Sequence, residues 1–320
     1  MTRFLPRATA MAKLFIDGQA GTTGLKIYDQ LKARGDIELL QIPEHARKDA
    51  KAKAAIFDAA DIVVLCLPDA AAKEAVTLLG DTRGKILDAS SAHRTAAGWV
   101  YGLPELDDEQ AAHIRGATRV SNPGCYSTGF ILAVRPLVAA GILPVDYPVT
   151  ANAVSGYTGG GKELIERYRA HPTRQGHDDW SFRPYALALT HKHVPEMQKY
   201  TGLAHPPLFV PAVVNFAQGM LVSVPLAHRA LKGAPTAADL HAVLARYYEN
   251  SPLVRVLPLQ DEGQLDRGFL SPLGLQDTNF VELMVYGNAA QSVVMARLDN
   301  LGKGASLAAI QNIELMLGLR

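Results

Sequence analysis

A glycine-rich turn near the start of the chain limits the possible folds most strongly. The stretch KLFIDGQAGTTGLKIYDQLKARG, residues 13–35, reads as an apolar strand, a turn with three regularly spaced glycines, and a helix with apolar residues at helical spacing. Glycines let a backbone approach a pyrophosphate closely, and the free N–H groups of a helix start stabilise its charge. By spacing alone, an ordinary turn is an equal alternative. The dinucleotide-binding candidates in this turn are Gly18, Gly21, Thr22, Thr23 and Gly24.

Three further apolar runs favour the dinucleotide interpretation. They cover residues 37–42, 61–68 and 84–91, and segments of helical character lie between them. Strands that alternate with helices predict an α/β fold with a doubly wound parallel sheet, which is the usual setting of such a turn. With 320 residues, the chain is long enough for a second domain as well.

The end of the second apolar run indicates which nicotinamide cofactor would be held. An NAD site usually carries an acidic residue about 20 positions past the glycines, where it binds the ribose 2′-hydroxyl. Here the run ends near Gln41 and continues as PEHARKD, so Arg47 and Lys48 are the candidates for neutralising a 2′-phosphate. The pattern therefore favours NADP(H), with a solvated basic turn as the alternative.

Residues at the ends of the next two runs should line the cofactor crevice, because parallel sheets bind ligands at the carboxyl ends of their strands. Pro68 ends one of these runs, and Ser90 and Ser91 end the other, so we expect cofactor contacts from these three. Arg94 is a further polar candidate in the same loop. A loop of small polar residues without such contacts is the alternative.

One of the two cysteines stands at a second predicted helix start. In SNPGCYSTGF, residues 121–130, Pro123 and Gly124 predict a turn, and an apolar helical pattern follows. Cys125 therefore lies at a helix N-terminus, where unpaired N–H groups should favour the thiolate and lower its pKa. Since thiolates attack carbonyl carbon, this position predicts a nucleophile rather than a structural cysteine. Cys66 lies inside an apolar run and is expected to be a small core residue.

A nucleophilic cysteine needs a partner for proton transfer, and ALTHKHVPEMQKY, residues 188–200, supplies the best candidates. His191 and His193 alternate in what we expect to be an extended segment, which would place both on one face. This pair alone is compatible with a metal site, but no matching cluster of ligands accompanies it, so we expect no metal. We expect one of the two histidines, with a pKa near neutrality, to act as general acid and base.

Composition argues against several other classes of protein. The formal net charge of +1 gives no indication of a nucleic-acid partner, and no apolar run approaches the roughly 18 residues of a membrane span. Two cysteines cannot form a disulfide framework, so we expect a cytoplasmic protein with free thiols. Met11 offers a second start, which would make residues 1–10 a dispensable, flexible extension.

Several motifs together resemble one enzyme family over nearly everything from Met11 onward. They are FIDGQAGTTGL, CLPDAAAKEA, DASSAHR, YGLPEL, SNPGCYSTG, SGYTGGGK, HKHVPEMQ and DNLGKGAS, the last followed by IQN. In these the chain resembles the N-acetyl-γ-glutamyl-phosphate reductases, specifically their shorter subtype. The resemblance implies NADPH, a small-molecule substrate, a cytoplasmic step of arginine biosynthesis and a homo-oligomer, either dimer or tetramer.

The resemblance also implies an order of domains. A Rossmann-type dinucleotide-binding domain would comprise residues 1–121 and 299–320. Residues 122–298 would form an inserted α+β catalytic domain with a mixed sheet, of the glyceraldehyde-3-phosphate dehydrogenase type. A final helix over residues 304–317 would fold back onto the cofactor domain and place Asn312 near the nicotinamide. The strands expected in the mixed sheet lie in residues 148–155, 220–228, 254–259 and, as a hairpin, 279–298.

For the substrate of this family, the residues predict covalent catalysis. Cys125 would attack the acyl phosphate of N-acetyl-γ-glutamyl phosphate, and the resulting thioester would accept hydride from NADPH to give N-acetylglutamate semialdehyde. His193, or alternatively His191, would transfer the proton, and Asn122 with the backbone N–H of Cys125 would bind the oxyanion. The substrate's phosphate and carboxylate need cations and backbone donors. The candidates are Arg94, Gly156, Lys162, Arg167, Arg169 and Arg183.

Three alternatives use only part of this pattern. An aspartate-semialdehyde dehydrogenase would share the fold and the chemistry and differ in the length of its acyl pocket, and the extended motif match disfavours it. A cysteine hydrolase has no need of a dinucleotide turn. A non-catalytic NADP-binding sensor needs neither the cysteine nor the histidine.

Overall fold

The computed structural model describes residues 11–47, 49–80, 84–171 and 180–319. The predicted extension over residues 1–10 and the predicted phosphate contact Lys48 lie outside the described residues.

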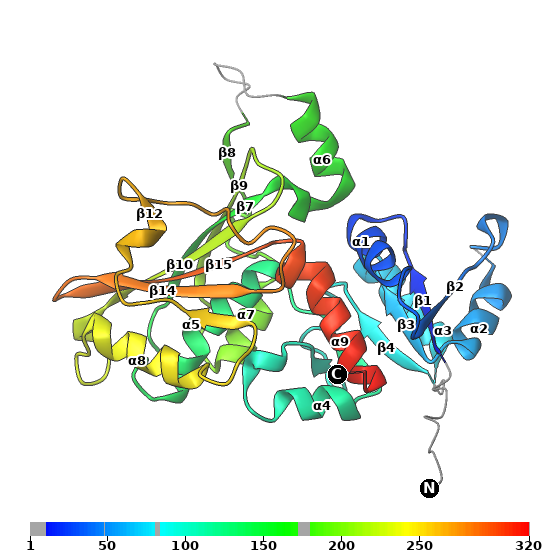
Figure 1. Ribbon diagram of the computed structural model, residues 1–320, viewed down its shortest axis with the longest axis horizontal. Coiled ribbons are helices and arrows are strands. Elements are labelled where there is room, and N and C mark those ends of the chain that lie inside the picture. Colours follow the sequence, from blue (N-terminus) through cyan, green and yellow to red (C-terminus); the bar gives the residue numbers. More distant parts are fainter. Residues whose placement is uncertain (1–10, 48, 81–83, 172–179, 320) are drawn as a thin grey trace, which may run out of the picture.

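Two sheets lie side by side and build the molecule (Figure 1). The first has six parallel strands in the order β2-β1-β3-β4-β6-β5, which confirms the predicted α/β fold. The predicted runs at 37–42, 61–68 and 84–91 contain β2, β3 and β4. The strands are β1 (Ala12–Asp17), β2 (Ile37–Leu40), β3 (Ile62–Leu65), β4 (Lys85–Asp88), β5 (Val100–Tyr101) and β6 (Arg119–Ser121).

Both faces of the parallel sheet are buried, because successive side chains of a strand point to opposite faces. Leu14 and Ile16 of β1 pack in one cluster of buried side chains, whereas Phe15 packs in another. The helices in contact with the first cluster are α1 (Thr22–Leu31), α4 (Gln110–Gly116) and α9 (Leu307–Leu317). Those of the second are α2 (Ala50–Ala59) and α3 (Asp69–Leu79).

Helix α9 is the last helix of the chain, and it packs against the first sheet, as predicted (Figure 1). The prediction started this helix at residue 304. Instead, Gly302–Ser306 forms a π-helical turn, and α9 follows it from Leu307. None of the described helices is long and apolar enough to cross a lipid bilayer.

The second sheet is mixed, as expected, and has seven strands in the order β11-β14-β15-β10-β7-β9-β8. Two of its pairs, β7 with β9 and β11 with β14, are parallel, and the other pairs are antiparallel. The predicted hairpin turns at residues 288–290. A separate small hairpin joins β12 (Leu265–Asp266) and β13 (Phe269–Leu270). The strands of the mixed sheet are β7 (Thr150–Gly156), β8 (Phe182–Pro184), β9 (Leu208–Val214), β10 (Met220–Ala227), β11 (Val254–Val256), β14 (Val281–Gly287) and β15 (Gln291–Leu298).

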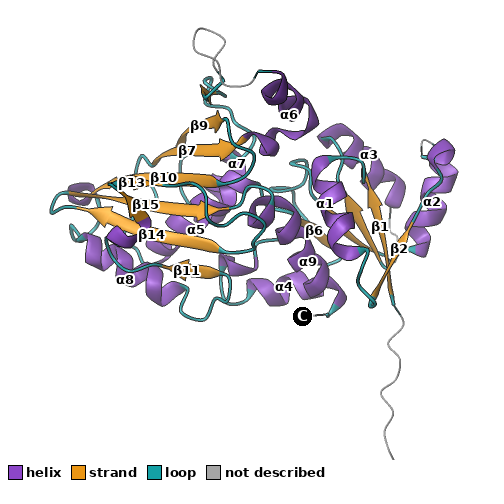
Figure 2. Cartoon of the chain, turned by 45° about the horizontal axis from the view of Figure 1, so that its top comes forward, coloured by secondary structure: helices purple, strands orange, loops and turns teal. Residues whose placement is uncertain are grey.

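Helices cover one face of the mixed sheet (Figure 1). They are α5 (Cys125–Ala139), α7 (Val194–Thr201) and α8 (Ala237–Tyr247). Most of α5 is buried in this core, so its first residue is held firmly between the two sheets. A further helix, α6 (Gly161–Ala170), projects beside β9 and lies over the junction of the two sheets in both views (Figures 1 and 2).

Candidate active site

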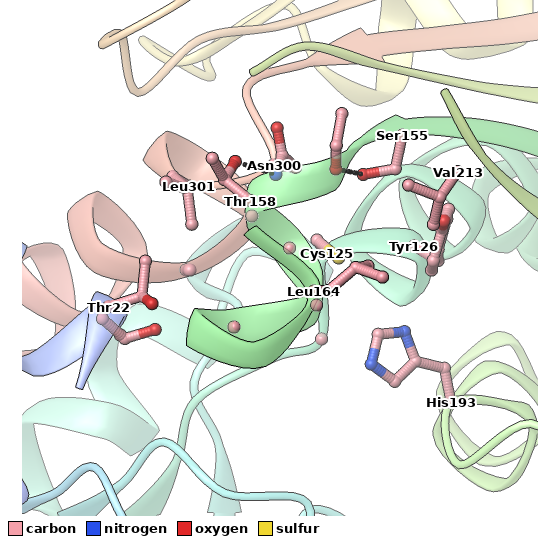
Figure 3. A pocket seen from close by; sticks show the side chains of 18 of the residues that line it. Thr22, Cys125, Tyr126, Ser155, Thr158, Leu164, His193, Val213, Asn300 and Leu301 are labelled. Atoms are coloured by element: carbon pink, nitrogen blue, oxygen red, sulfur yellow. Dashed lines mark hydrogen bonds between the residues drawn. The ribbon is translucent and has the colours of Figure 1, made fainter. Parts of the chain in front are cut away.

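A cavity of about 440 Å³ opens where the two sheets meet. Its walls come from the starts of α1 and α5, the turn before α7 and the glycine-rich segment that leads into α6 (Figure 3). Residues predicted from distant motifs meet at this one place. Those that line the cavity are Thr22, Thr23, Arg94, Asn122, Cys125, Gly156, Arg183, His191 and His193.

Cys125 is the first residue of α5, as predicted. The predicted lowering of its pKa is wrong, however, since burial raises the pKa of the Cys125 thiol to about 11. The positive charge of Arg94 and the N–H of Tyr126 act in the opposite direction, but removing a thiolate from water outweighs both. The free site therefore holds a thiol at neutral pH.

The two histidines do not lie in the expected extended segment. His193 is the N-cap of α7 and has helical dihedral angles, with φ −86° and ψ −14°, so the predicted alternation on one face is wrong. Because the chain turns here, the backbone N–H of His193 donates to Nδ1 of His191 at 3.1 Å. The two rings meet edge to face, with centroids 4.6 Å apart.

The hydrogen bonds of the two rings separate their roles. Since Nδ1 of His191 is an acceptor, the neutral ring carries its proton on Nε2, which lies 3.2 Å from the hydroxyl of Tyr185. His193 is also buried, yet its Nδ1 has no partner in the described part of the chain. An unpaired nitrogen in a ring on the cavity wall makes His193 the better candidate for proton transfer.

Both rings are neutral at pH 7, contrary to the expected pKa near neutrality. Burial lowers the pKa of His191 to about 4 and that of His193 well below its ordinary value, and the cations Arg94 and Lys192 act in the same direction. A neutral imidazole is able to accept the proton of the Cys125 thiol. The pair therefore starts as thiol and imidazole.

Glu196 was not among the predicted site residues, yet its buried carboxylate joins several parts of the site. One oxygen accepts a hydrogen bond from Nη1 of Arg94 at 2.8 Å. The other accepts from the Tyr101 hydroxyl at 2.6 Å and from the N–H of Gly124 at 3.2 Å. Glu196 lies three residues after His193. Had a helix been predicted from Val194, residues three apart would have been expected on the same side of it, and Glu196 would have been a candidate.

Arg94 lines the cavity, but its guanidinium is the cation of the Glu196 pair and only 8% of the residue is exposed. Its Nη1 and the ring of His193 both lie against Gly124. A Cβ atom at that position would be 2.5 Å from each of them. The glycine before the cysteine is therefore required by the close approach of these two side chains.

Asn122 and Asn312 are linked beneath the cavity. The Asn122 amide donates to the carbonyl of Ala305 at 3.0 Å and accepts from the Asn312 amide at 3.1 Å. Asn122 lines the cavity, whereas Asn312 is fully buried and also donates to the carbonyl of Gly102. Asn312 thus reaches the site through Asn122.

The glycine turn fits a dinucleotide. Gly18 has φ +86°, and a Cβ atom there would lie 2.2 Å from the carbonyl oxygen of Cys66, while one at Gly24 would lie 2.6 Å from the carbonyl oxygen of Gly18. Helix α1 begins at Thr22 with no side chain capping its first turn, which leaves its N–H groups for an anion. A smaller cavity of about 160 Å³ adjoins this turn, and Arg47 lines it.

The loops after β3 and β4 are held by carboxylates. Ser90 donates through its N–H and hydroxyl to Asp88, at 2.9 and 2.8 Å, and Ser91 donates likewise to Asp69, at 3.0 and 2.7 Å. Pro68 precedes Asp69 as the N-cap of α3. None of these residues lines the main cavity.

Burial raises the pKa of Cys66 to about 12, in keeping with a core residue near the same edge of the sheet.

The predicted substrate cations divide into two groups. Lys162 and Arg167 are exposed on α6 and face Glu166 and Glu163, and neither they nor Arg169 line the cavity. Arg183 does line it, with its guanidinium 5.0 Å from the centre of the Trp180 ring. Lys192, which was not predicted, lines it as well.

Over the described ranges, no three histidine, cysteine or acidic side chains gather in a way that suits a metal ion.

Two family descriptions match the chain. "Semialdehyde dehydrogenase, NAD binding domain" covers residues 9–114, and "Semialdehyde dehydrogenase, dimerisation domain" covers residues 125–300. Aspartate semialdehyde dehydrogenase II of Vibrio cholerae has the same fold, with a TM-score of 0.71 over 96% of this chain and 98% of that chain at 15% identity. The enzyme of Francisella tularensis gives 0.70 over 95% and 99%, also at 15% identity. The fold is thus that of the semialdehyde dehydrogenase class.

More similar relatives narrow this class. N-acetyl-gamma-glutamyl-phosphate reductase 2 of a Nostoc species is 51% identical over 96% of this chain and 97% of its own length. The N-acetyl-gamma-glutamyl-phosphate reductase of Mesorhizobium japonicum is 48% identical over 96% and 99%. The chain therefore belongs to the N-acetyl-γ-glutamyl-phosphate reductase family, which confirms the resemblance seen in its motifs.

Proposed function

We propose that this protein reduces N-acetyl-γ-glutamyl phosphate to N-acetylglutamate semialdehyde with NADPH, as a cytoplasmic step of arginine biosynthesis. The observation that carries the proposal is the single cavity at which Cys125, His193 and the start of α1 meet (Figure 3). The names of relatives about half identical in sequence supply the substrate.

The proposed division of labour follows the two sheets. Residues 1–121 and 299–320 would bind the dinucleotide, and residues 122–298 would bind the acyl substrate. Strand β6 ends at Ser121 and β15 ends at Leu298, which supports these bounds. The glycine turn and the start of α1 would hold the pyrophosphate, and Arg47 the 2′-phosphate. When bound, NADPH supplies the hydride that reduces the acyl carbon.

The residues of the cavity would make and release the covalent intermediate. Sγ of Cys125 attacks the acyl carbon while its proton passes to the neutral imidazole of His193. The N–H of Cys125 and the amide of Asn122 stabilise the oxyanion, and the bond to the phosphate oxygen then breaks. Phosphate leaves with the proton from His193, and Cys125 remains as a thioester. After reduction, collapse of the thiohemiacetal oxyanion releases the aldehyde and leaves Cys125 as a thiolate, which takes up a proton from water through His193 to restore the thiol.

A homo-oligomer is also part of the proposal, with the uncovered face of the mixed sheet as its contact surface. Tyr286, Val293 and Pro225 lie side by side on neighbouring strands, opposite the face that α5 and α8 cover, and all three are partly or fully exposed. The dimerisation-domain description spans these strands. Sedimentation would test this surface, because Val293→Arg should dissociate the assembly, and a wild-type monomer at micromolar concentration would contradict it.

The activity is best tested in the reverse direction. N-acetylglutamate semialdehyde, phosphate and NADP⁺ should give NADPH absorbance, and omission of phosphate should stop it. Cys125→Ser should remove nearly all turnover and change NADPH affinity by no more than a few-fold, because a serine hydroxyl is hardly ionised near neutral pH. Cys66→Ser is the matched control and should remain active.

Three outcomes would contradict the proposal. Faster turnover of aspartate semialdehyde than of N-acetylglutamate semialdehyde would favour the aspartate-semialdehyde dehydrogenase alternative. Substantial turnover by Cys125→Ser would refute the thioester route. Binding of NADPH without turnover of either aldehyde would favour the sensor.

A further inference from the structure

One wall of the active-site cavity takes no part in the proposed covalent steps. Tyr168 of α6 and Trp180 and Arg183 near β8 line this wall. The Tyr168 ring stacks on Tyr157, with centroids 5.0 Å apart and planes 16° apart, and Trp180 meets it edge-on at 5.3 Å. The Arg183 guanidinium lies over the ring of Trp180. We call Tyr168, Trp180 and Arg183 the aromatic wall.

Two polar groups of the aromatic wall lack the partners that a purely structural role would provide. Tyr168 is 3% exposed, and its hydroxyl has no hydrogen-bond partner in the part of the chain that the structure describes. A buried hydroxyl left unpaired is costly, so one in a cavity wall points to an acceptor on a ligand. Arg183 is exposed and forms no ion pair with any described residue; burial raises the pKa of Tyr168, and the charge of Arg183 lowers it. A donor and a cation thus lie together.

The other cations of the cavity are placed differently. Arg94 is neutralised by Glu196. Lys192 lies near the nucleophile, since its charge acts on the pKa of Cys125 and of His193. The proposed substrate carries two anions, a phosphate on the reacting carbon and a carboxylate at the far end of the acyl chain. Lys192 suits the first by its position, and the aromatic wall is left for the second.

We propose that Arg183 and the Tyr168 hydroxyl bind the remote carboxylate of the substrate, which makes the aromatic wall the element that selects acyl substrates bearing a second carboxylate. The assignment rests on the proposed function. The guanidinium pairs with the carboxylate while Trp180 holds it in place from one side, and the phenol donates to one carboxylate oxygen.

The test compares two aldehydes in the phosphate-dependent reverse assay. One is N-acetylglutamate semialdehyde, and the other is 4-acetamidobutanal, which is the same molecule with hydrogen in place of the carboxylate. Arg183→Gln should lower kcat/KM for the first by roughly 10- to 100-fold, mainly through KM, because the contact is made equally before and during reaction. Arg183→Gln should leave kcat/KM for 4-acetamidobutanal unchanged. Tyr168→Phe should lower kcat/KM for N-acetylglutamate semialdehyde by about 3- to 10-fold and leave that for 4-acetamidobutanal unchanged. Arg183→Lys should recover part of the kcat/KM that Arg183→Gln loses.

A matched control is Arg255→Gln. Arg255 also stacks on an aromatic ring, 3.5 Å from the centre of Phe280, but it is outside the cavity, so both aldehydes should be turned over as by the wild type. NADPH affinity is measured for every variant and should not change, which shows that each is folded.

The possible failures can be told apart. If the wild type is active and Arg183→Gln lowers kcat/KM for both aldehydes equally, or for neither, the carboxylate subsite is refuted while the proposed function stands. If the wild type turns over neither aldehyde, the proposed function is refuted and the subsite's ligand with it.

Discussion

Alkylation of Cys125 by iodoacetamide in the free protein should accelerate about tenfold for each pH unit between about pH 7 and pH 10, because only the thiolate reacts. With a pKa of about 11, the thiolate fraction at pH 8 is on the order of one in a thousand. A cysteine with the ordinary pKa of about 8.5 would reach its limiting rate near pH 9 to 10. The two cases therefore differ by a large factor in rate at pH 8.

Two substitutions test which charges set this pKa. Glu196→Gln removes an anion that raises the pKa of Cys125, so alkylation at pH 8 should become faster. Arg94→Gln removes the cation that lowers it and leaves Glu196 uncompensated, so alkylation should become slower. Since breaking a buried ion pair costs roughly 3–5 kcal/mol, the melting temperature of both variants is followed, and only rates from the folded range are compared.

The assay measures the Cys125 peptide by mass spectrometry in timed, quenched samples. Cys66 is an internal comparison, because burial raises its pKa to about 12 and it should be labelled about tenfold more slowly than Cys125. A rate for Cys125 that is independent of pH from about 7 to 9 would refute the reasoning and show a thiolate in the free site. Slower alkylation of Glu196→Gln, or faster alkylation of Arg94→Gln, would refute the assignment of the charges.

Two other predictions concern proton transfer and the cofactor. His193→Asn should lower turnover roughly 10²- to 10⁴-fold; it should also remove the acid limb of the kcat/KM profile, which we expect below the ordinary imidazole pKa because a lowered pKa keeps the ring basic to lower pH. His191→Asn should cost much less, since both ring nitrogens serve local hydrogen bonds, and the reverse ranking would move the proton transfer to His191. Arg47→Gln should weaken the binding of NADPH by up to about tenfold in a fluorescence titration, because the side chain is half exposed. The binding of NADH should not change. An equal loss of affinity for both cofactors would place the 2′-phosphate elsewhere.

Features encoded in short stretches of sequence were predictable. The first four strands of the parallel sheet lie in apolar runs because both sheet faces are covered, and such runs are recognisable without the fold. The short strands β5 and β6 were not predicted. The helix start at Cys125 follows from a turn and an apolar period within ten residues. Gly18 was predictable for a similar reason, since its conformation is a property of the turn itself.

Features that depend on distant contacts were not predictable. The pKa of Cys125 was expected from its helix start alone, but its value is set mainly by burial under segments far away in the sequence, such as Gly304. The local spacing of the two histidines suggested an extended segment, and only the fold shows the turn. Glu196 was missed because its partners Arg94 and Tyr101 lie about one hundred residues earlier.

The protonation states of the site determine when the nucleophile forms. The substrate brings an acyl phosphate, whose negative charge would raise the pKa of the Cys125 thiol further if it were not balanced. Lys192 is positioned to balance it, whereas Arg94 is already committed to Glu196. A thiolate formed in advance would thus be disfavoured by burial and by the arriving charge alike. In the proposed mechanism, proton transfer to His193 would therefore accompany attack on the acyl carbon, a role that suits a neutral, buried imidazole with an unpaired nitrogen.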